Sequence, residues 1–385
     1  MAAFAQILQG RGVTVSGSDT DETFFTDEVL RTLNIPFTEG FSASNIPDVI
    51  DIAITSPAYI NTDNPEIAEI QARGVELITW HDGLAQLFNT GFGIAVCGTH
   101  GKSTTTAMLG VILERAGLNP TVMVGSRVNA WNSNARVGKS DYFVIEADEY
   151  RDAFLHYNPK MIVVTNVEYD HPDYFPTPES YTLSFEKFTK RVSGDNLIRT
   201  PEQLIPFALK FPGEHNQKNA NAAYRAALAL GVDATIAREA LESFSGLARR
   251  FEYIGEYKGT PLYDDYAHHP TEISALLQGA REQFPDKKIS VLFQPHTFSR
   301  TQRLFDEFVL ALSATDSVAI LRTYGSARES GEDAIGQKLA QTLNAPYFAN
   351  HDEATEYFAN NTTENSVLFS MGAGDGWQVL KQLTT

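Results

Sequence analysis

The sequence predicts an α/β protein made of three domains, each built on a mainly parallel sheet. Short apolar runs that suit buried strands alternate along nearly the whole chain with segments of helical period. Polar clusters follow several of these runs directly, as they do where parallel sheets bind ligands. A chain of 385 residues is long enough for two or three domains. We place the boundaries near residues 90 and 245, which gives domains 1–90, 91–245 and 246–385.

Composition limits the classes of partner. The formal net charge of −18 argues against a general nucleic-acid or anionic-membrane surface. No apolar run approaches membrane-spanning length, and the opening segment lacks the basic start of a signal peptide. Cys97 is the only cysteine, so we expect no internal disulfide and no cysteine zinc site, which fits a reducing cytoplasm. We therefore expect small-molecule partners, with neither nucleic acid nor membrane among them.

The stretch from Ile94 to Thr106 predicts a phosphate-binding loop between a strand and a helix. Apolar residues up to Cys97 suit a buried strand, and a helical pattern begins at Lys102 and runs to about Ala116. Backbone N–H groups at such a loop attract anionic oxygens, a lysine there can reach the β- and γ-phosphates, and Ser103 can ligate Mg²⁺. The stretch therefore indicates nucleotide binding.

A plain strand-to-helix turn is the competing interpretation of the same residues. Only Thr99 and His100 separate Gly98 from Gly101, whereas the common phosphate-loop pattern has four residues between its glycines. The strand before the loop and the threonine run from Thr104 to Thr106 favour the phosphate loop.

Two further strands of the central region end in polar clusters. We expect the strands near Tyr142–Ile145 and Met161–Thr165, and the clusters are Glu146–Glu149 and Asn166–His171. Because the carboxyl ends of parallel strands share one edge of a sheet, both clusters should face the phosphate loop. Together with Ser103, carboxylate and imidazole ligands there could hold one or two Mg²⁺ ions. For either cluster alone, an ordinary solvated turn is the alternative.

The region before the loop predicts a doubly wound, Rossmann-like layer. Strands are expected at Val13–Val15 and Val49–Thr55, and a helix is expected to begin near Asn64–Glu66 with proline in its first turn. Farther along the chain, Asn216 is predicted to cap the helix expected from Ala220 to Leu230.

After about residue 245 the alternation restarts and predicts a third, Rossmann-like α/β domain. A hairpin comes first, followed by a helix to about Gln283 that Thr271 would cap. His268 and His269 are neighbours on an extended chain, so they point to opposite faces and cannot easily chelate one ion. Arg300 follows a strand and could clamp a carboxylate. Further strands are expected at Ile289–Phe293, Ser317–Leu321 and Ser366–Phe369.

With these motifs assembled, the chain resembles the Mur ligases of peptidoglycan synthesis over nearly its whole length and in the family's order. The phosphate loop and Asp170–His171 are typical of the superfamily, whereas Asp264–Glu272 and Gln294–Thr301 resemble the branch that adds alanine. The other matching stretches are Ser56–Ala58, Asn64–Glu66, Asn134–Arg136, Glu146–Glu149, Gly213–Asn219 and Gly372–Asp375.

The resemblance implies an ATP-dependent ligase of three domains. The first domain would hold a UDP-sugar, the second ATP, and the third would close over ATP and bring the amino acid. ATP and Mg²⁺ are the implied cofactors, and UDP-N-acetylmuramate and L-alanine are the implied substrates. ATP would phosphorylate the lactyl carboxylate, and the amine of L-alanine would then attack the acyl phosphate. A monomer or a weak homodimer is expected.

The resemblance also implies roles for individual residues. Catalytic positions are matched by Lys102, Glu146, His171, His268 and Arg300, and metal ligands by Ser103, Glu146 and His171. Nucleotide contacts are implied for Gly98, Thr99, His100, Gly101, Lys102, Ser103, Thr104, His215, Asn219, Arg250 and Asp265, with His215 and Asn219 at the adenine. Substrate contacts are implied for Ser56, Asn134, Arg136, His268, His296 and Arg300.

Three departures from the family pattern modify these expectations. The chain begins with the helix that follows the family's glycine-rich diphosphate cradle, so that cradle is expected upstream of Met1 or is lost. The stretch 192–212 is shorter than in the family, and Thr297 stands where some members carry an arginine. Two other functions stay open: a recycling ligase that joins a tripeptide to the same sugar, and a catalytically silent nucleotide-binding homologue.

Overall fold

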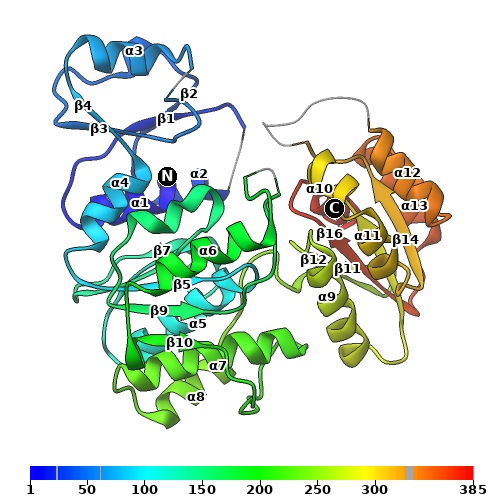
Figure 1. Ribbon diagram of the computed structural model, residues 1–385. Coiled ribbons are helices and arrows are strands. Elements are labelled where there is room, and N and C mark those ends of the chain that lie inside the picture. Colours follow the sequence, from blue (N-terminus) through cyan, green and yellow to red (C-terminus); the bar gives the residue numbers. More distant parts are fainter. Residues whose placement is uncertain (23–24, 61, 173, 326–332, 385) are drawn as a thin grey trace. The chain divides into compact units, whose positions relative to one another are not determined.

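The computed structural model describes residues 1–22, 25–60, 62–172, 174–325 and 333–384 (Figure 1). The chain divides into two compact units. One consists of Met1–Ala208 and Lys218–Ser245, and the other of Leu209–Gln217 and Gly246–Thr385. The domain boundaries near residues 90 and 245 stay predictions.

A six-stranded sheet forms the centre of the first unit. Its strands run in the order β10-β9-β5-β8-β6-β7, and every neighbouring pair is parallel except β6 and β7. The α/β class and the parallel sheet are therefore as predicted. The strands are β5 (Phe92–Cys97), β6 (Thr121–Val128), β7 (Ser133–Arg136), β8 (Tyr142–Glu146), β9 (Met161–Val164) and β10 (Leu197–Arg199).

Helices cover both faces of this sheet because its strands are apolar on both sides. Along β5, Ala95 and Cys97 belong to a core shared with α1, α4 and α6, while Ile94 and Val96 point to the opposite face. On that opposite face α5 packs against β6, β8 and α8. The helices are α1 (Ala2–Gly10), α4 (Trp80–Phe88), α5 (Lys102–Arg115), α6 (Pro178–Thr189), α7 (Glu214–Ala229) and α8 (Ala234–Ser243), with short 3-10 turns at Tyr150–His156 and Gly194–Asn196.

The first ninety residues form two parallel strand pairs in place of one continuous sheet. The strand predicted at Val13–Val15 begins later, at Gly17, and the one predicted from Val49 begins at Ile52, since Val49 is 86% exposed. Asn64 caps the next helix, with proline at its first position, as predicted. The pairs are β1 (Gly17–Asp19) with β2 (Phe37–Glu39) and β3 (Ile52–Thr55) with β4 (Glu76–Thr79), accompanied by α2 (Phe25–Thr32), a 3-10 turn at Ala43–Asn45 and α3 (Pro65–Ala72).

The second unit contains another six-stranded sheet, in the order β11-β12-β16-β13-β14-β15. Only β11 and β12, the predicted hairpin, are antiparallel. The strands are β11 (Glu252–Tyr257), β12 (Thr260–Asp265), β13 (Lys288–Phe293), β14 (Ser317–Leu321), β15 (Tyr347–Phe348) and β16 (Ser366–Met371).

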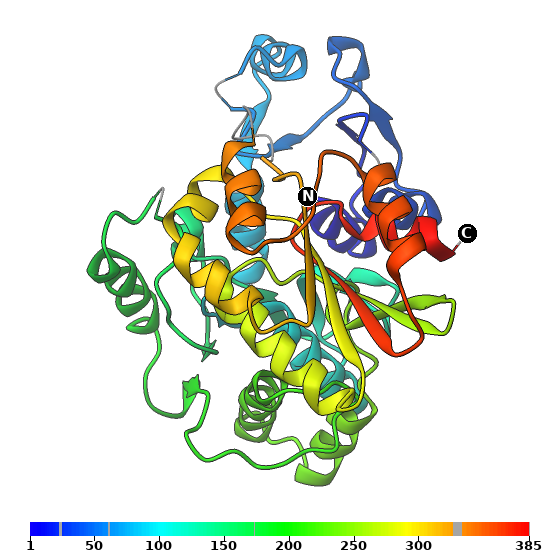
Figure 2. The same ribbon diagram turned by 90° about the vertical axis from the view of Figure 1, so that its right-hand side faces the viewer.

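Apolar side chains alternate along β13 and fill two separate cores. Ile289, Val291 and Phe293 pack with α9, α11 and α12, whereas Leu292 packs with α13 and α14. Figure 2 shows α9 and α11 side by side in yellow. The helices are α9 (Pro270–Gln283), α10 (Phe298–Arg303), α11 (Phe305–Leu312), α12 (Ala334–Thr342), α13 (His351–Asn361) and α14 (Trp377–Thr384).

Two predicted helix caps are wrong. Helix α7 begins at Glu214, so Asn216 lies inside the first turn, where its Nδ2 donates to the carbonyl of Pro212 at 2.7 Å. Helix α9 is capped by His269, whose Nδ1 accepts from the N–H of Thr271 at 3.3 Å. Because Pro270 occupies the first helical position, the cap lies two residues earlier than the predicted threonine.

Two further observations concern the described residues alone. None of the described helices is both long and apolar enough to cross a membrane. Within the same described residues, the segment 200–213 contains neither helix nor strand, so β10 is an edge strand of the central sheet.

Candidate active site

The loop between β5 and α5 requires both of its glycines. Gly98 and Gly101 have φ angles of +140° and +81°, which side chains rarely adopt. A Cβ at Gly98 would lie 2.0 Å from Oγ1 of Thr165, and one at Gly101 would lie 2.2 Å from Oδ1 of Asn219. The neighbouring chain therefore packs directly against the loop backbone at the N-terminus of α5.

Polar side chains from the segment just after β9 and from α6 hold this loop in place. Thr165 Oγ1 donates to the carbonyl of His100 at 2.6 Å, and Asn166 bonds the same residue through both its amide nitrogen and its amide oxygen. Thr99 Oγ1 accepts from the N–H of Glu168 at 2.9 Å and lies 2.9 Å from the Tyr181 hydroxyl. The loop is thus shaped before any ligand arrives.

Lys102 is folded back over the loop and paired with a buried carboxylate. Its Nζ lies 2.8 and 3.1 Å from the two carboxylate oxygens of Glu149, and it donates to the carbonyls of Gly98 and Thr99 at 2.6 and 3.2 Å. The side chain of Glu149 is 1% exposed. Burial works to lower the pKa of the ammonium, but the surrounding carboxylates, with Glu149 foremost, outweigh burial and raise it. Lys102 is therefore a cation at neutral pH.

Carboxylates and an imidazole gather at the carboxyl ends of β8 and β9, as the sequence predicted. Ser103 Oγ donates to Oε1 of Glu146 at 2.9 Å, and the other carboxylate oxygen of Glu146 accepts from the N–H of Gly125 at 2.7 Å. His171 Nε2 instead lies 3.7 Å from Oε1 of Glu149, and its backbone φ of +55° is uncommon for a histidine. The predicted metal ligands thus fall into two neighbouring groups.

The second group offers two carboxylates, which a hard divalent cation prefers, and one imidazole. Asp148, Glu149 and His171 each present one ligand atom, and these three atoms lie within 4.8 Å of one another. The two carboxylate oxygens suit Mg²⁺ or Mn²⁺, while the imidazole nitrogen is a less typical ligand for these ions. The residues present therefore fit the cofactor that the sequence led us to expect.

His215 and Asn219, the predicted adenine contacts, lie one turn apart on α7. Asn219 is buried and touches the loop at Gly101, as described above. The ring of His215 folds back over Gly213, where a Cβ would lie 2.6 Å from its Cε1 atom. Their contact with a base stays a prediction.

In the second unit, buried charges surround the carboxyl end of β12. Asp265 accepts from the N–H groups of Phe251 and Ala267 at 2.7 and 2.8 Å, and burial raises the pKa of its carboxyl group. Arg249 donates to the neighbouring Asp264 at 2.8 Å, and Arg250 lies 3.8 Å from Glu272. The predicted nucleotide residues Arg250 and Asp265 thus lie in one charged cluster.

The residues predicted to hold the amino acid also come together in the second unit. The rings of His268 and His296 are 5.7 Å apart, and Nη1 of Arg300 lies 3.4 Å from Nδ1 of His296. Burial lowers the pKa of His268 to about 3, although Glu272 beside it acts in the opposite direction. His268 is therefore neutral at physiological pH. Tyr324, which the sequence did not single out, stacks on His296, and the centroids of the two rings are 5.9 Å apart.

The three predicted substrate residues of the first unit make contacts within the protein. Asn134 Oδ1 accepts from Nε2 of Gln6 in α1 at 3.0 Å, and Ser56 caps a turn by accepting from the N–H of Ala58. The guanidinium of Arg136 is engaged by Glu114, by the carbonyl of Pro120 and by the side chain of Asn119. Substrate binding by these residues stays a prediction, and the contacts of Arg136 favour a structural role.

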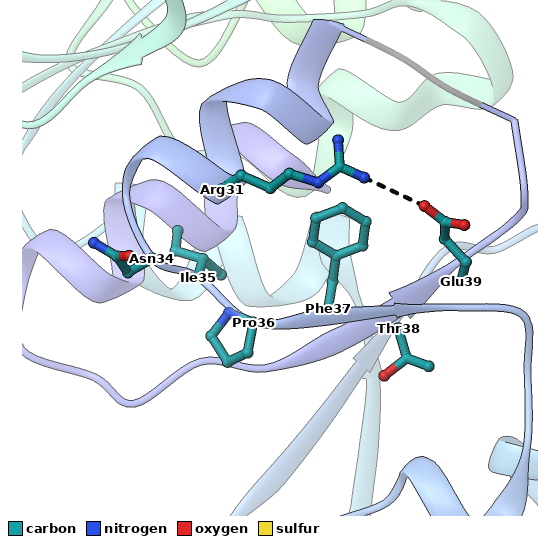
Figure 3. Close-up of a pocket in the computed structure, with 7 residues that line it drawn as sticks. All are labelled: Arg31, Asn34, Ile35, Pro36, Phe37, Thr38 and Glu39. Atoms are coloured by element: carbon teal, nitrogen blue, oxygen red, sulfur yellow. Dashed lines mark hydrogen bonds and ion pairs between the residues drawn. The ribbon is translucent and has the colours of Figure 1, made fainter.

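An open cavity of about 670 Å³ lies between α2 and β2 (Figure 3). Arg31 pairs with Glu39 at 3.3 Å across it, and the guanidinium lies 5.1 Å above the ring of Phe37. All seven lining residues come from one stretch of chain, which includes neither the phosphate loop nor the polar clusters after β8 and β9. We therefore assign it no substrate. Its lining is Arg31, Asn34, Ile35, Pro36, Phe37, Thr38 and Glu39.

Sequence reasoning missed the partner of the loop lysine. Glu149 belongs to a cluster that the sequence marked, but only Glu146 in that cluster received a role. Tyr181 donates to Oε1 of Glu149 at 3.2 Å and carries no sequence signal, because it lies in the first turn of a helix far along the chain. Tertiary contacts alone reveal both residues.

Comparison with known proteins identifies the family of this chain. Three family models match in order: "Mur ligase family, catalytic domain" at residues 1–91, "Mur ligase middle domain" at 96–198 and "Mur ligase, glutamate ligase domain" at 249–374. A UDP-N-acetylmuramate–L-alanine ligase of Desulfitobacterium hafniense (strain Y51) is 36% identical over 436 aligned positions, which cover 100% of this chain and 96% of that one. This chain belongs to the Mur ligase family. The relative carries residues that this Mur ligase lacks, because their alignment is longer than the chain.

Solved structures give the same fold for this Mur ligase. The UDP-N-acetylmuramate–alanine ligase of Thermotoga maritima has a TM-score of 0.84 at 28% identity, covering 100% of this chain and 95% of that one. A murein peptide ligase of Psychrobacter arcticus 273-4 has a TM-score of 0.74 at 21% identity, covering 100% and 95%. The second likeness is evidence for the fold alone.

Proposed function

We propose that this Mur ligase joins L-alanine to the lactyl carboxylate of UDP-N-acetylmuramate at the expense of ATP. The observation that carries the proposal is full-length similarity, at 36% identity, to a relative that bears this activity as its name. The contacts of Lys102 and the cluster around Arg300 support it, because they supply a phosphate loop and an amino-acid carboxylate clamp.

Two chemical steps explain why the enzyme would need ATP. A carboxylate is a poor electrophile, and hydroxide would be a poor leaving group from it. Phosphorylation of the carboxylate by the γ-phosphate of ATP gives an acyl phosphate and ADP. The amine of L-alanine then attacks the acyl carbon, and inorganic phosphate leaves. Lys102, a cation at neutral pH, would neutralise charge on the transferring phosphoryl group.

We propose Mg²⁺ as the cofactor of this site. Ser103 and Glu146 would hold one ion beside the loop, and His171 with Asp148 and Glu149 offers donors for a second. The ion would neutralise negative charge on the phosphate oxygens. Of the three predicted metal ligands, Ser103 and Glu146 lie together, while His171 lies with Asp148 and Glu149 and would bind the second ion.

At the amino-acid end, Arg300 would bind the carboxylate of L-alanine and His268 would position the substrate. His268 Nδ1 lies 3.0 Å from the carbonyl of Tyr266, which favours the tautomer with the proton on Nδ1. Its Nε2 then carries a lone pair that can accept a hydrogen bond. A histidine whose pKa lies near 3 is a weak base, so positioning suits it better than proton removal.

A coupled assay tests the proposal. Purified enzyme should release phosphate only when ATP, Mg²⁺, UDP-N-acetylmuramate and L-alanine are all present. Release that does not depend on an amino acid would refute it, and a preference for the tripeptide over L-alanine would identify a recycling ligase instead. Nucleotide binding without any turnover would identify a silent homologue.

We further propose a cytoplasmic monomer or weak dimer, in keeping with Cys97 as a buried free thiol.

A further inference from the structure

The ammonium group of Lys102 already has a full set of partners. A lysine ammonium carries three protons. In this structure Nζ lies within hydrogen-bond distance of four oxygens, two from the carbonyls of Gly98 and Thr99 and two from the carboxylate of Glu149. The lysine that a phosphate loop needs for its nucleotide is therefore occupied by a competing anion of the same chain.

Glu149 depends on this lysine as much as the lysine depends on it. Its side chain is 1% exposed, so water cannot replace a lost partner. Apart from Lys102, its nearest donor is the hydroxyl of Tyr181 at 3.2 Å, and His171 Nε2 lies farther off at 3.7 Å. If Lys102 turns toward a phosphate group, the buried carboxylate keeps, among the described residues, the Tyr181 hydroxyl and the more distant His171. That loss is costly unless another cation arrives.

We propose that Glu149 is a positioning residue that holds Lys102 folded back and makes nucleotide binding depend on a divalent cation. The nucleotide phosphates and Glu149 compete for one ammonium group. A cation beside Asp148, Glu149 and His171 compensates the carboxylate and releases the lysine. The inference rests on the proposed binding of ATP at this loop.

The consequence is a coupling between two ligands at one site. Without a divalent cation the nucleotide must break the buried ion pair, so its affinity is low. With the cation present, the charge of Glu149 is matched again and the lysine is free to bind phosphate. A purely structural Glu149, which only anchors the loop, would produce no such link between metal and nucleotide.

Binding of ADP tests this coupling without any turnover. We would measure the Kd of ADP by calorimetry in EDTA and in saturating Mg²⁺, for the unmodified enzyme and for Glu149→Gln. The amide keeps the shape but loses the charge, so it should lower the Kd in EDTA by about tenfold and reduce the gain from Mg²⁺. Glu239→Gln is the matched control, since Glu239 forms an exposed ion pair with Arg115 and should change neither Kd.

Tyr181→Phe provides a second variant with the opposite expected sign. It removes the hydroxyl donor that Glu149 would keep after Lys102 leaves, so the Kd of ADP in EDTA should rise about tenfold. Should Glu149→Gln fail to fold, this variant decides the question through its metal dependence. The Tyr181 hydroxyl also lies 2.9 Å from Thr99 Oγ1, and a distorted loop would raise the Kd equally in EDTA and in Mg²⁺, whereas the inference requires a larger rise in EDTA. A folded Glu149→Gln enzyme that binds ADP in EDTA no more tightly than the unmodified enzyme overturns the inference, as does a Tyr181→Phe enzyme with unchanged affinity. If the unmodified enzyme binds no ADP in either buffer, the proposed function fails instead.

Discussion

Lys102 illustrates how one side chain joins stability to function. From the sequence alone, replacing it with alanine should abolish turnover and leave the fold intact. Its contacts change the second half of that expectation. Glu149 is almost completely buried and has Lys102 as its only close cationic partner among the described residues. Removing the lysine therefore leaves an uncompensated charge in the interior.

Lys102→Ala should lower the free energy of unfolding by about 3 kcal/mol as well as abolish phosphate release. Adding Glu149→Gln to it should restore most of the stability and none of the activity, because the buried charge is gone but the phosphate contact is still missing. Urea unfolding of both variants checks this. Equal stability of Lys102→Ala and the unmodified enzyme would show that Glu149 finds another partner.

The next prediction concerns Arg300, which we propose to bind the carboxylate of L-alanine. Arg300→Ala should raise the KM for L-alanine by about 10- to 100-fold, the range expected for losing a charge-assisted hydrogen bond, with a smaller change in kcat. Arg300→Lys keeps the charge without the planar fork, so its KM should fall in between. Steady-state kinetics with varied L-alanine measures both, and an unchanged KM in the alanine variant would place the carboxylate elsewhere.

At the scale of elements, the junction of β5 and α5 determines the site. The helix starts at Lys102 because Gly101 adopts a left-handed conformation that turns the chain into the first helical residue. Helix α7 then packs its Asn219 amide against that glycine. A strand, a loop, a helix and a second helix thus meet at one backbone position.

A pair of glycine variants tests this junction. Gly101→Ala and Gly117→Ala both force alanine into a left-handed conformation, at φ angles of +81° and +75°, which costs about 1 kcal/mol each. A Cβ at Gly117 meets nothing within 4 Å, whereas one at Gly101 meets Oδ1 of Asn219 at 2.2 Å. Gly101→Ala should therefore lose about 2 kcal/mol more stability, and ADP binding with it. Equal thermal shifts in the two variants would contradict the close packing.

At the scale of the whole molecule, the two compact units have separate cores and can be followed separately. Trp377 is the only tryptophan of the chain after residue 245, so replacing Trp80 and Trp131 with phenylalanine makes fluorescence a reporter of the second unit. This separation matters for pH dependence, because the second unit contains buried groups whose pKa values are shifted in opposite directions.

Asp264→Asn should remove one part of that pH dependence. Burial raises the pKa of Asp264 to about 6, against the pull of Arg249, while the unfolded chain has about 3.9. Because the folded pKa is the higher one, this group stabilises the fold fully below about pH 4, and the contribution is lost as pH rises through about 6. The unfolding free energy of the variant minus that of the parent should therefore increase by up to about 3 kcal/mol between pH 4 and pH 7.

The pH-dependent contributions of other groups to the unfolding free energy cancel in this difference, because both proteins contain those groups. The lowered pKa of His268 makes the fold lose stability as pH falls below about 6.5, which is the opposite sign, but both proteins share it. Denaturant unfolding at several pH values, followed through Trp377, measures the difference. A difference that stays constant from pH 4 to pH 7 would show that Asp264 titrates normally.

The sequence by itself determined the elements whose signals are local. The helix from Lys102, the strand Ser317–Leu321 and the helix ending at Gln283 were predicted to within a residue or so, because apolar period, glycines and prolines lie next to one another in the chain. The predicted strand at Val13–Val15 failed for the complementary reason: a strand needs a partner, and the partner strand Phe37–Glu39 pairs with Gly17–Asp19 instead.

Only the tertiary structure decided how the site residues pair. Lys102 and Glu149 are 47 positions apart, and Tyr181 lies 32 positions farther on, so no local pattern connects them. The sequence placed Ser103, Glu146 and His171 in one metal set, yet in the fold Glu146 lies with Ser103, while Glu149 lies with Lys102 and nearer to His171. Chemistry along a chain can be recognised residue by residue, but which charges lie close together depends on how distant strands pack.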